Sequence, residues 1–305
     1  MIVAQEFIDL SFPKYKVLAW CSVARSSFYY CPSIGLRGRK PYAVVKDKDG
    51  KIVGNETVVK IIEQLFEHPF VDYGYYKTYI YLRKKQHLQI SKHLIYRLMK
   101  NHQLLRNQYS SSSKKMKRNW VKDLLPQVEV PFTYLEFDIK FVWIAGMNRN
   151  LQVLTILDVF SRWNVSHLIA YSIKYQDVIK LFERAFQHLT IPEKFYVRCD
   201  NGSQFIADMV QKYFKDKKVI QEFTKPATPQ QNSHIESYHS IMENAVCQRF
   251  QFRDLKDAKQ TMNQFRDFYN FDRIHGGVGF QSPYEFLQSK GLDMKNSPIN
   301  QIPIP

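Results

Sequence analysis

The sequence has few cysteines, and they lie far apart. The four are Cys21, Cys31, Cys199 and Cys247, and none belongs to a Cys-x-x-Cys pair. This spacing argues against a zinc knuckle and a disulfide framework, and it favours a reducing cytoplasm. No apolar run approaches the roughly 20 residues that span a bilayer, and the first residues lack the basic-then-apolar order of a signal peptide. We therefore expect a soluble intracellular protein with no membrane contact.

Acidic residues are scarce in the first half of the chain, which gives the charge a lopsided distribution. The net charge of the 305 residues is +16. Residues 1–130 hold 23 Lys and Arg against 10 Asp and Glu, whereas residues 131–305 hold 21 against 18. A basic front half joined to a nearly neutral back half indicates a polyanion-binding module followed by something else. A basic surface kept for solubility is the alternative.

Short helices are predicted in the front half. Apolar spacing and turn signals place them at 14–30 (two short helices around a turn), 56–68, 75–85 and 91–101, with a basic loop or hairpin at 33–55. Ser91 is a good N-cap for the last helix. One face of that helix is apolar, and the other carries Lys92, His93, Tyr96, Arg97 and Lys100. This layout is typical of helix-turn-helix DNA binders, although an ordinary amphipathic helix with a solvated face has the same pattern.

A serine-rich segment at 107–119 predicts a linker between the halves. Its basic cluster could also follow DNA phosphates, and it consists of Lys114, Lys115, Lys117 and Arg118.

The back half changes to apolar, β-rich segments at short intervals. Strands are predicted at 132–144, 151–160, 165–171, 194–199 and 219–223, and helices at 176–189, 203–214, 232–250 and 255–270. This order indicates a mixed α/β domain.

Three acids in the back half stand at positions suited to metal chemistry. Asp138 lies inside the first predicted strand, and Asp200 ends the fourth, before a glycine that permits a tight turn and Ser203, which can cap the next helix. Glu236 lies in the first turn of a long helix. Converging carboxylates suit divalent cations, and two ions can activate the attacking oxygen and stabilise the leaving one in phosphoryl transfer. Taken singly, each acid could equally be a buried or helix-capping residue.

Several ordered segments resemble one known group. The 35 residues between Asp200 and Glu236 reproduce the D-D-35-E spacing of retroviral integrases and many bacterial transposases. The matching segments are LDVFSR at 157–162, CDNGSQF at 199–205, ATPQQNSHIES at 227–237, YNFDRIHGGVGFQSPYEF at 269–286, the helical stretch at 73–105 and WCSVARSSFYY at 20–30. Together they resemble OrfB-type transposases of insertion-sequence family three.

The resemblance implies a fold and an activity. The fold is α/β, an RNase-H-like mixed-sheet catalytic core preceded by an all-α helix-turn-helix DNA-binding region. The activity is DNA cleavage and strand transfer with two Mg²⁺ or Mn²⁺ ions. Asp138 and Asp200 would share one ion, and Asp138 and Glu236 would hold the other. We place a helix-turn-helix-like segment and basic loop at 1–55, a DNA-binding domain at 56–106, a linker at 107–124, the catalytic core at 125–295 and a tail at 296–305.

Further roles are implied for residues outside the triad. Asp158 is interpreted as structural or supporting, and Arg273 and His275 as contacting DNA or packing against the core. Two residues depart from the family pattern. Lys140 stands where a Thr is common two residues after the first Asp, and Glu243 stands where a Lys or Arg is common seven residues after the Glu. Lys140 is a candidate DNA contact. The candidates for a nearby cation that compensates for Glu243 are Lys140, His239 and Arg249.

The implied partners are the element's terminal repeats, the target duplex and further copies of the chain on DNA. Family members are often fused to an upstream OrfA partner. The expected location is the bacterial cytoplasm, in association with the nucleoid. Three alternatives stay open: an integrase of a retrovirus-like element, a catalytically silent DNA-binding regulator with a degenerate integrase fold, and an RNase-H-like ribonuclease.

Overall fold

The computed structural model describes residues 2–30, 42–106, 128–189, 191–225 and 229–295, and the chain divides into two units, Met1–Ala43 and Val44–Pro305. The first unit contains α1 (Ile2–Asp9), α2 (Lys14–Trp20) and α3 (Arg25–Phe28). The second and third helices confirm the two short helices predicted within 14–30. Helix α1 was not predicted. The small core of this unit is made of Ala4, Val17 and Leu18.

The second unit opens with a hairpin and three helices, as the sequence predicts. The elements are β1 (Val44–Lys46), β2 (Ile52–Gly54), α4 (Asn55–Glu67), α5 (Tyr75–Lys84) and α6 (Lys92–Asn101). The hairpin turn contains Gly50 at φ 81°, a left-handed conformation that favours glycine. Ser91 caps α6 by accepting a hydrogen bond from the N–H of Leu94 at 3.3 Å.

A five-stranded mixed sheet forms the centre of the second unit, in the order β5-β4-β3-β6-β7. The strands are β3 (Tyr134–Ile144), β4 (Arg149–Asp158), β5 (Asn164–Ala170), β6 (Tyr196–Cys199) and β7 (Ile220–Phe223). The first three pair antiparallel, while β6 pairs parallel to both β3 and β7. The five predicted strands are therefore confirmed.

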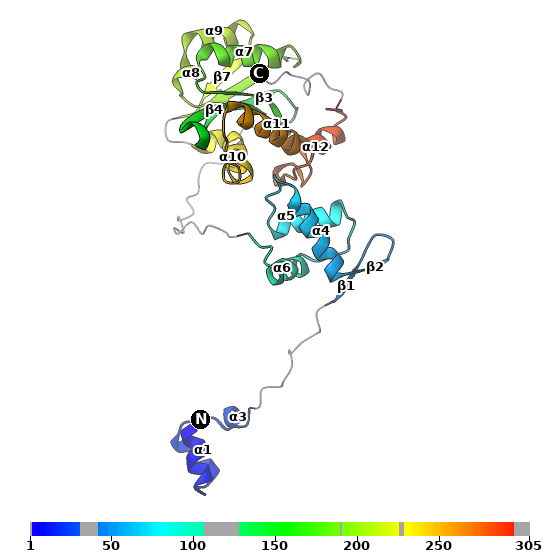
Figure 1. Ribbon diagram of the computed structural model, residues 1–305, viewed down its shortest axis with the longest axis vertical. Helices are drawn as coiled ribbons and strands as arrows, with labels where there is room; N and C mark the ends of the chain where they lie inside the picture. The colour runs from blue at the N-terminus through cyan, green and yellow to red at the C-terminus, as the bar shows by residue number, and fades with distance from the viewer. Residues whose placement is uncertain (1, 31–41, 107–127, 190, 226–228, 296–305) are drawn as a thin grey trace. The chain divides into compact units, whose positions relative to one another are not determined.

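Helices cover both faces of this sheet (Figure 1). One face carries α7 (Tyr175–Phe186), α8 (Ser203–Ile206) and α9 (Asp208–Asp216), and the other carries α10 (Ser233–Met242), the π-helix η4 (Glu243–Cys247) and α11 (Leu255–Phe271). The alternation of β3 decides which side chain meets which layer. Phe137 packs under α7 and α8, whereas Val142 packs with the layer of α10 and α11.

Three predicted details differ from the structure. The helix predicted at 203–214 is divided at Ala207, whose ψ of 133° is extended. The helix predicted at 232–250 continues from α10 into the π-helix η4. The last helix, α12 (Pro283–Ser289), was not predicted, although Ser282 and Glu285 form a capping box before and within it.

The segment between α4 and α5 belongs to the core of the sheet. Phe70, Val71 and Tyr73 are each 4% exposed or less and pack in the layer of α10 and α11. Arg249 on that side donates hydrogen bonds to the carbonyls of Pro69 (2.8 Å) and Val71 (3.0 Å). The buried side chains of α4, α5 and α6 themselves form a separate apolar cluster, and the partly buried Phe66 and Tyr81 pack against both clusters. Among the described residues, no helix combines the length and apolar character needed to cross a membrane.

Candidate active site and DNA-binding surface

The register of β3 and β6 brings the first two predicted acids together. Glu136 on β3 pairs with Arg198 on β6 in a parallel ladder, which ends at this pair. Asp138 and Asp200 each stand two residues further along their chains. Side chains two residues apart on a strand project from the same face, so Asp138 lies on the face of Glu136, and Asp200 directly follows the end of the neighbouring strand.

The electrostatic environment of Asp138 includes the other two predicted acids. Burial, followed by the negative charges of Asp200 and Glu236, raises the pKa of Asp138 to about 7. The hydrogen bond from the N–H of Ile139 to Oδ1 of Asp138, at 2.8 Å, acts in the opposite direction. Burial also raises the pKa of Glu236, with a further contribution from the charge of Glu136. Carboxyl groups that lie close together resist losing their protons, and a cation bound between them would lower their pKa values.

Gly202 shapes the turn after Asp200. The carboxylate of Asp200 accepts a hydrogen bond from the N–H of Gly202 at 2.9 Å. A Cβ at Gly202 would lie 2.5 Å from Nε2 of Gln204 and 3.1 Å from Oδ1 of Asp200. A larger residue at position 202 would therefore displace the side chain of Gln204 and crowd the carboxylate of Asp200, whereas the φ of −58° is open to any residue. The prediction that Ser203 caps the next helix is wrong, because Gly202 holds the N-cap position and there is no side-chain cap there.

Glu236 lies in the first turn of α10, as predicted, and its side chain is exposed. In the part of the chain that the structure describes, no three His, Cys, Asp or Glu side chains already stand as a metal-binding group. The donor set nevertheless fits a hard cation, since carboxylate oxygens predominate and the charges of Asp200 and Glu236 contribute, after burial, to the raised pKa of Asp138.

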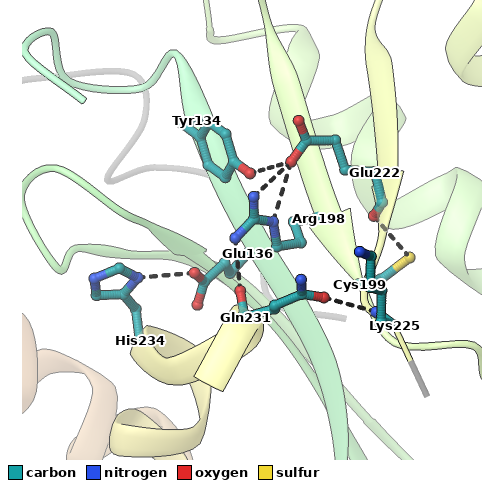
Figure 2. Close-up of polar contacts among 8 residues, drawn as sticks. All are labelled: Tyr134, Glu136, Arg198, Cys199, Glu222, Lys225, Gln231 and His234. Carbon is teal, nitrogen blue, oxygen red and sulfur yellow. Dashed lines mark hydrogen bonds and ion pairs between the residues drawn. The ribbon is translucent and has the colours of Figure 1, made fainter. Parts of the chain in front are cut away.

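A polar network that the sequence did not predict connects β3, β6 and β7 with the start of α10 (Figure 2). Glu136 contacts Nδ1 of His234 at 2.8 Å and accepts the N–H of Ile235 at 2.8 Å. Arg198 donates to Glu222 (2.8 Å from Nη2) and to the carbonyl of Gln231 (2.7 Å). The available signal was a charged residue two positions before each aspartate, in strands that are otherwise largely apolar.

The two departures from the family pattern contact each other. Nζ of Lys140 on β3 lies 2.9 Å from Oε2 of Glu243, where α10 passes into the π-helix. The side chains of Lys140 and Glu243 are 19% and 41% exposed. The cation expected to compensate for Glu243 is therefore Lys140.

His239 also faces the acids from α10. Its Nδ1 lies 3.5 Å from Oδ2 of Asp138. Burial, and then the charge of Lys140, lowers the pKa of His239 to about 3, so the ring is neutral near pH 7. It therefore adds no positive charge to Asp138.

Three further candidates are buried. Asp158 is 0% exposed and accepts hydrogen bonds from the N–H groups of Phe132 (2.9 Å) and Ser161 (2.8 Å), which supports the structural interpretation. Arg273, 2% exposed, forms an ion pair with Asp72, and His275 is 6% exposed. Burial followed by the charge of Arg273 puts the pKa of His275 well below its usual value. Of the two roles expected for Arg273 and His275, these positions favour packing, so neither belongs to the DNA-binding surface proposed below.

Helix α6 presents the predicted two faces. Leu94, Ile95, Leu98 and Met99 are buried. On the other side Lys92, His93, Tyr96 and Lys100 are exposed, and Arg97 is half-buried. The basic cluster of Lys114, Lys115, Lys117 and Arg118 lies outside the described residues.

Comparisons with known families agree with this architecture. Residues 129–229 match a family model described as an integrase core domain, and residues 217–283 match a second model with the same description. Residues 54–110 match an HTH-like domain. The chain thus carries an integrase core behind a helical HTH-like region, and the predicted RNase-H-like α/β fold class is confirmed.

Three relatives of the chain come from bacterial insertion elements. An uncharacterized 39.2 kDa protein of insertion element IS476 from Xanthomonas euvesicatoria is 25% identical over 53% of this chain and 47% of its own length. A 31.7 kDa protein of IS407 from Burkholderia multivorans is 26% identical, over 49% and 54%. The transposase of IS904 from Lactococcus lactis is 22% identical, over 48% and 60%. The predicted resemblance to OrfB-type transposases of insertion-sequence family three is confirmed, and the chain spans about half the length of these relatives.

Among solved structures, a chain of the simian T-cell lymphotropic virus intasome aligns with a TM-score of 0.48 at 12% identity. That alignment covers 81% of this chain and 77% of the other.

Proposed function

We propose that this chain is a DNA transposase that cleaves and joins DNA at the ends of an insertion sequence. The observation that carries the proposal is the position of Asp138 in the integrase core. It follows the Glu136–Arg198 register pair beside Asp200, and its raised pKa includes contributions from Asp200 and Glu236. A buried carboxyl whose pKa is raised in part by two further acids, within an integrase-type sheet, supports phosphoryl transfer better than it supports a structural role.

Asp138, Asp200 and Glu236 would hold two Mg²⁺ or Mn²⁺ ions, which would activate the attacking oxygen and stabilise the leaving oxygen. The protein's own contribution is to hold the acids on rigid elements. Asp138 is fixed within a strand paired on one side with β4, and Asp200 is held by the N–H of Gly202 at 2.9 Å. Glu236 is carried by α10, so its approach to the aspartates depends on where that helix begins.

The exposed face of α6 is proposed as a surface that contacts the element's terminal repeats. It combines two lysines, Lys92 and Lys100, with the aromatic Tyr96, opposite a buried apolar face. Phosphate contacts by such lysines provide affinity and set the position of the protein on DNA.

The test replaces each acid without changing its size. We expect Asp138→Asn, Asp200→Asn and Glu236→Gln each to abolish Mg²⁺-dependent cleavage and strand transfer on terminal-repeat DNA while retaining DNA binding. Asp208→Asn is the matched control, because it removes the same charge from an exposed helix start near Asp200. It should keep full activity. Full activity in any triad variant would refute that residue's assignment, and degradation of RNA–DNA hybrids without strand joining would replace the transposase proposal with a ribonuclease.

A further inference from the structure

Two charged residues lie one pleat below the proposed metal-binding aspartates. Glu136 precedes Asp138 by two residues on β3, and Arg198 precedes Asp200 by two residues on β6. Glu136 and Arg198 are partners in the β3–β6 ladder. Because strand side chains alternate between faces, Glu136 shares a face with Asp138, and Asp200 is the first residue after the end of β6.

Both side chains reach the segment that leads into Glu236. The two oxygens of Glu136 contact Nδ1 of His234 and the N–H of Ile235, each at 2.8 Å. Nη1 of Arg198 donates to the carbonyl of Gln231 at 2.7 Å (Figure 2). Ile235 is the residue immediately before Glu236. The strands of both aspartates are thereby bonded to the start of the helix that carries the third acid.

The contact from Glu136 replaces a cap that α10 does not supply itself. The N–H groups of a helix's first turn have no partner within the helix and need an outside acceptor. The N-cap residue, Asn232, makes no side-chain cap hydrogen bond. The carboxylate of Glu136 accepts from Ile235, the third residue of α10, and a negative charge is also favoured at this end of a helix. The cap comes from β3, about 100 residues away in the chain.

Burial makes these contacts specific. The side chain of Glu136 is 0% exposed, and that of Arg198 is 14% exposed. A buried carboxylate is costly unless it is hydrogen-bonded, so Glu136 strongly favours the helix position that satisfies it. Arg198 donates a hydrogen bond to Glu222, and its guanidinium lies over the ring of Tyr134. These contacts orient the guanidinium toward Gln231. Both oxygens of Glu136 are engaged below the surface, which distinguishes it from a metal ligand.

We propose that Glu136 and Arg198 are positioning residues that fix the start of α10 and thereby set how closely Glu236 approaches Asp138 and Asp200. The metal-binding part of this inference rests on the proposed function. A loss of either contact would leave all three carboxylates in the chain but place Glu236 on a less ordered helix start.

The first test follows the helix start by hydrogen exchange in full-length, metal-free protein. Glu136→Ala should accelerate amide exchange at 234–236 by about tenfold or more relative to β3, since its acceptor is lost. Glu136→Gln retains an acceptor and should lie between wild type and Glu136→Ala. Asp158→Ala is the matched control. This variant removes another fully buried carboxylate of the same sheet, which accepts hydrogen bonds from Phe132 and Ser161. It should leave the rate of amide exchange at 234–236, relative to β3, unchanged.

The second test measures binding of Mn²⁺ alone by calorimetry. Although its ligands are intact, Glu136→Ala should bind Mn²⁺ about tenfold to a hundredfold more weakly, as expected for residues that orient ligands. In strand transfer the same variant should lower kcat with unchanged affinity for terminal-repeat DNA, and Glu136→Gln should recover part of the loss. If Glu136→Ala does not fold, Arg198→Met gives the same readouts through the carbonyl of Gln231.

The outcomes separate this inference from the proposed function. Wild-type exchange ratios and Mn²⁺ affinity in a folded Glu136→Ala would overturn the positioning role. A different result is also possible: Glu136→Ala weakens Mn²⁺ binding, but the wild-type protein joins no DNA. That result would sustain the positioning role and overturn the transposase proposal.

Discussion

At the scale of single residues, Asp138 has the most informative environment. Its carboxyl is mostly buried on β3, and its pKa of about 7 compares with an ordinary 3.8. Between these pH values the unfolded chain releases a proton that the folded chain retains. The stabilising contribution is therefore present below pH 3.8 and is lost as the pH rises through about 7.

This titration predicts a stabilising substitution at the proposed active site. In metal-free buffer, Asp138→Asn should raise the free energy of unfolding by on the order of a few kcal/mol at pH 8 and change it little at pH 4. Urea unfolding at a series of pH values measures the difference, with Asp208→Asn as the exposed control. Parallel pH profiles for wild type and Asp138→Asn would show that the carboxyl is not coupled as described.

The Lys140–Glu243 pair offers a second test at this scale. Nζ of Lys140 lies 2.9 Å from Oε2 of Glu243. Glu243 therefore pairs with a cation that could otherwise contact a DNA phosphate. The pair is half-exposed and contributes under about 1 kcal/mol to stability. Glu243→Lys should therefore tighten binding to terminal-repeat DNA, and Lys140→Thr should weaken strand transfer more than it lowers unfolding free energy.

Affinity measured across a salt series for both single variants and the double variant decides this prediction. Each gained phosphate contact should steepen the salt slope by about 0.9. Unchanged affinity and slope in all three variants would mean that this side of α10 does not meet DNA.

At the scale of elements, periodicity accounts for most of what the sequence predicts. Strands β3–β7 and helices α4–α6 are found where their apolar spacing placed them. The interruption at Ala207 and the π-helix at Glu243–Cys247 were missed, because both are local changes of backbone geometry that leave the apolar spacing intact. A prediction from spacing cannot distinguish a continuous helix from one with an inserted turn.

Helix α6 has the clearest division of faces, and its exposed lysines should affect DNA binding. Lys92→Gln combined with Lys100→Gln should weaken binding to terminal-repeat DNA and to unrelated duplexes alike, with a salt slope lower by about 0.9 for each lost phosphate contact. Lys60→Gln, on the exposed side of α4, is the control and should keep the wild-type slope. If the α6 double variant behaves like this control, the solvated-face interpretation of α6 is correct.

At the scale of the whole molecule, residues of the predicted DNA-binding domain at 56–106 and of the predicted core at 125–295 pack in one apolar layer. Phe70, Val71 and Tyr73 pack with α10 and α11, and Asp72 pairs with the buried Arg273. These contacts make the segment before α5 a part of the sheet's own core. The ion pair with Asp72 also explains how the charged side chain of Arg273 can be buried.

Breaking the Asp72–Arg273 pair should therefore destabilise the whole second unit. Asp72→Ala leaves a buried guanidinium without its partner and should lower the free energy of unfolding by about 3–5 kcal/mol. Lys85→Ala is the matched control, because it breaks the ion pair between Lys85 and Glu285. The side chains of Lys85 and Glu285 are 43% and 31% exposed. Its cost should be under about 1 kcal/mol. Equal losses in denaturant unfolding would show that Asp72 does not compensate a buried charge.

Local patterns in the sequence were enough for most of the elements and for the two faces of α6, because these depend on spacings of two to four residues along the chain. The sequence also predicted that a nearby cation would compensate for Glu243. Tertiary structure decided which cation that is, that Arg273 and His275 are buried, and that Glu136 caps α10. Each of those contacts joins residues far apart in the sequence, so it depends on strand register and on the packing of layers, which no local pattern encodes.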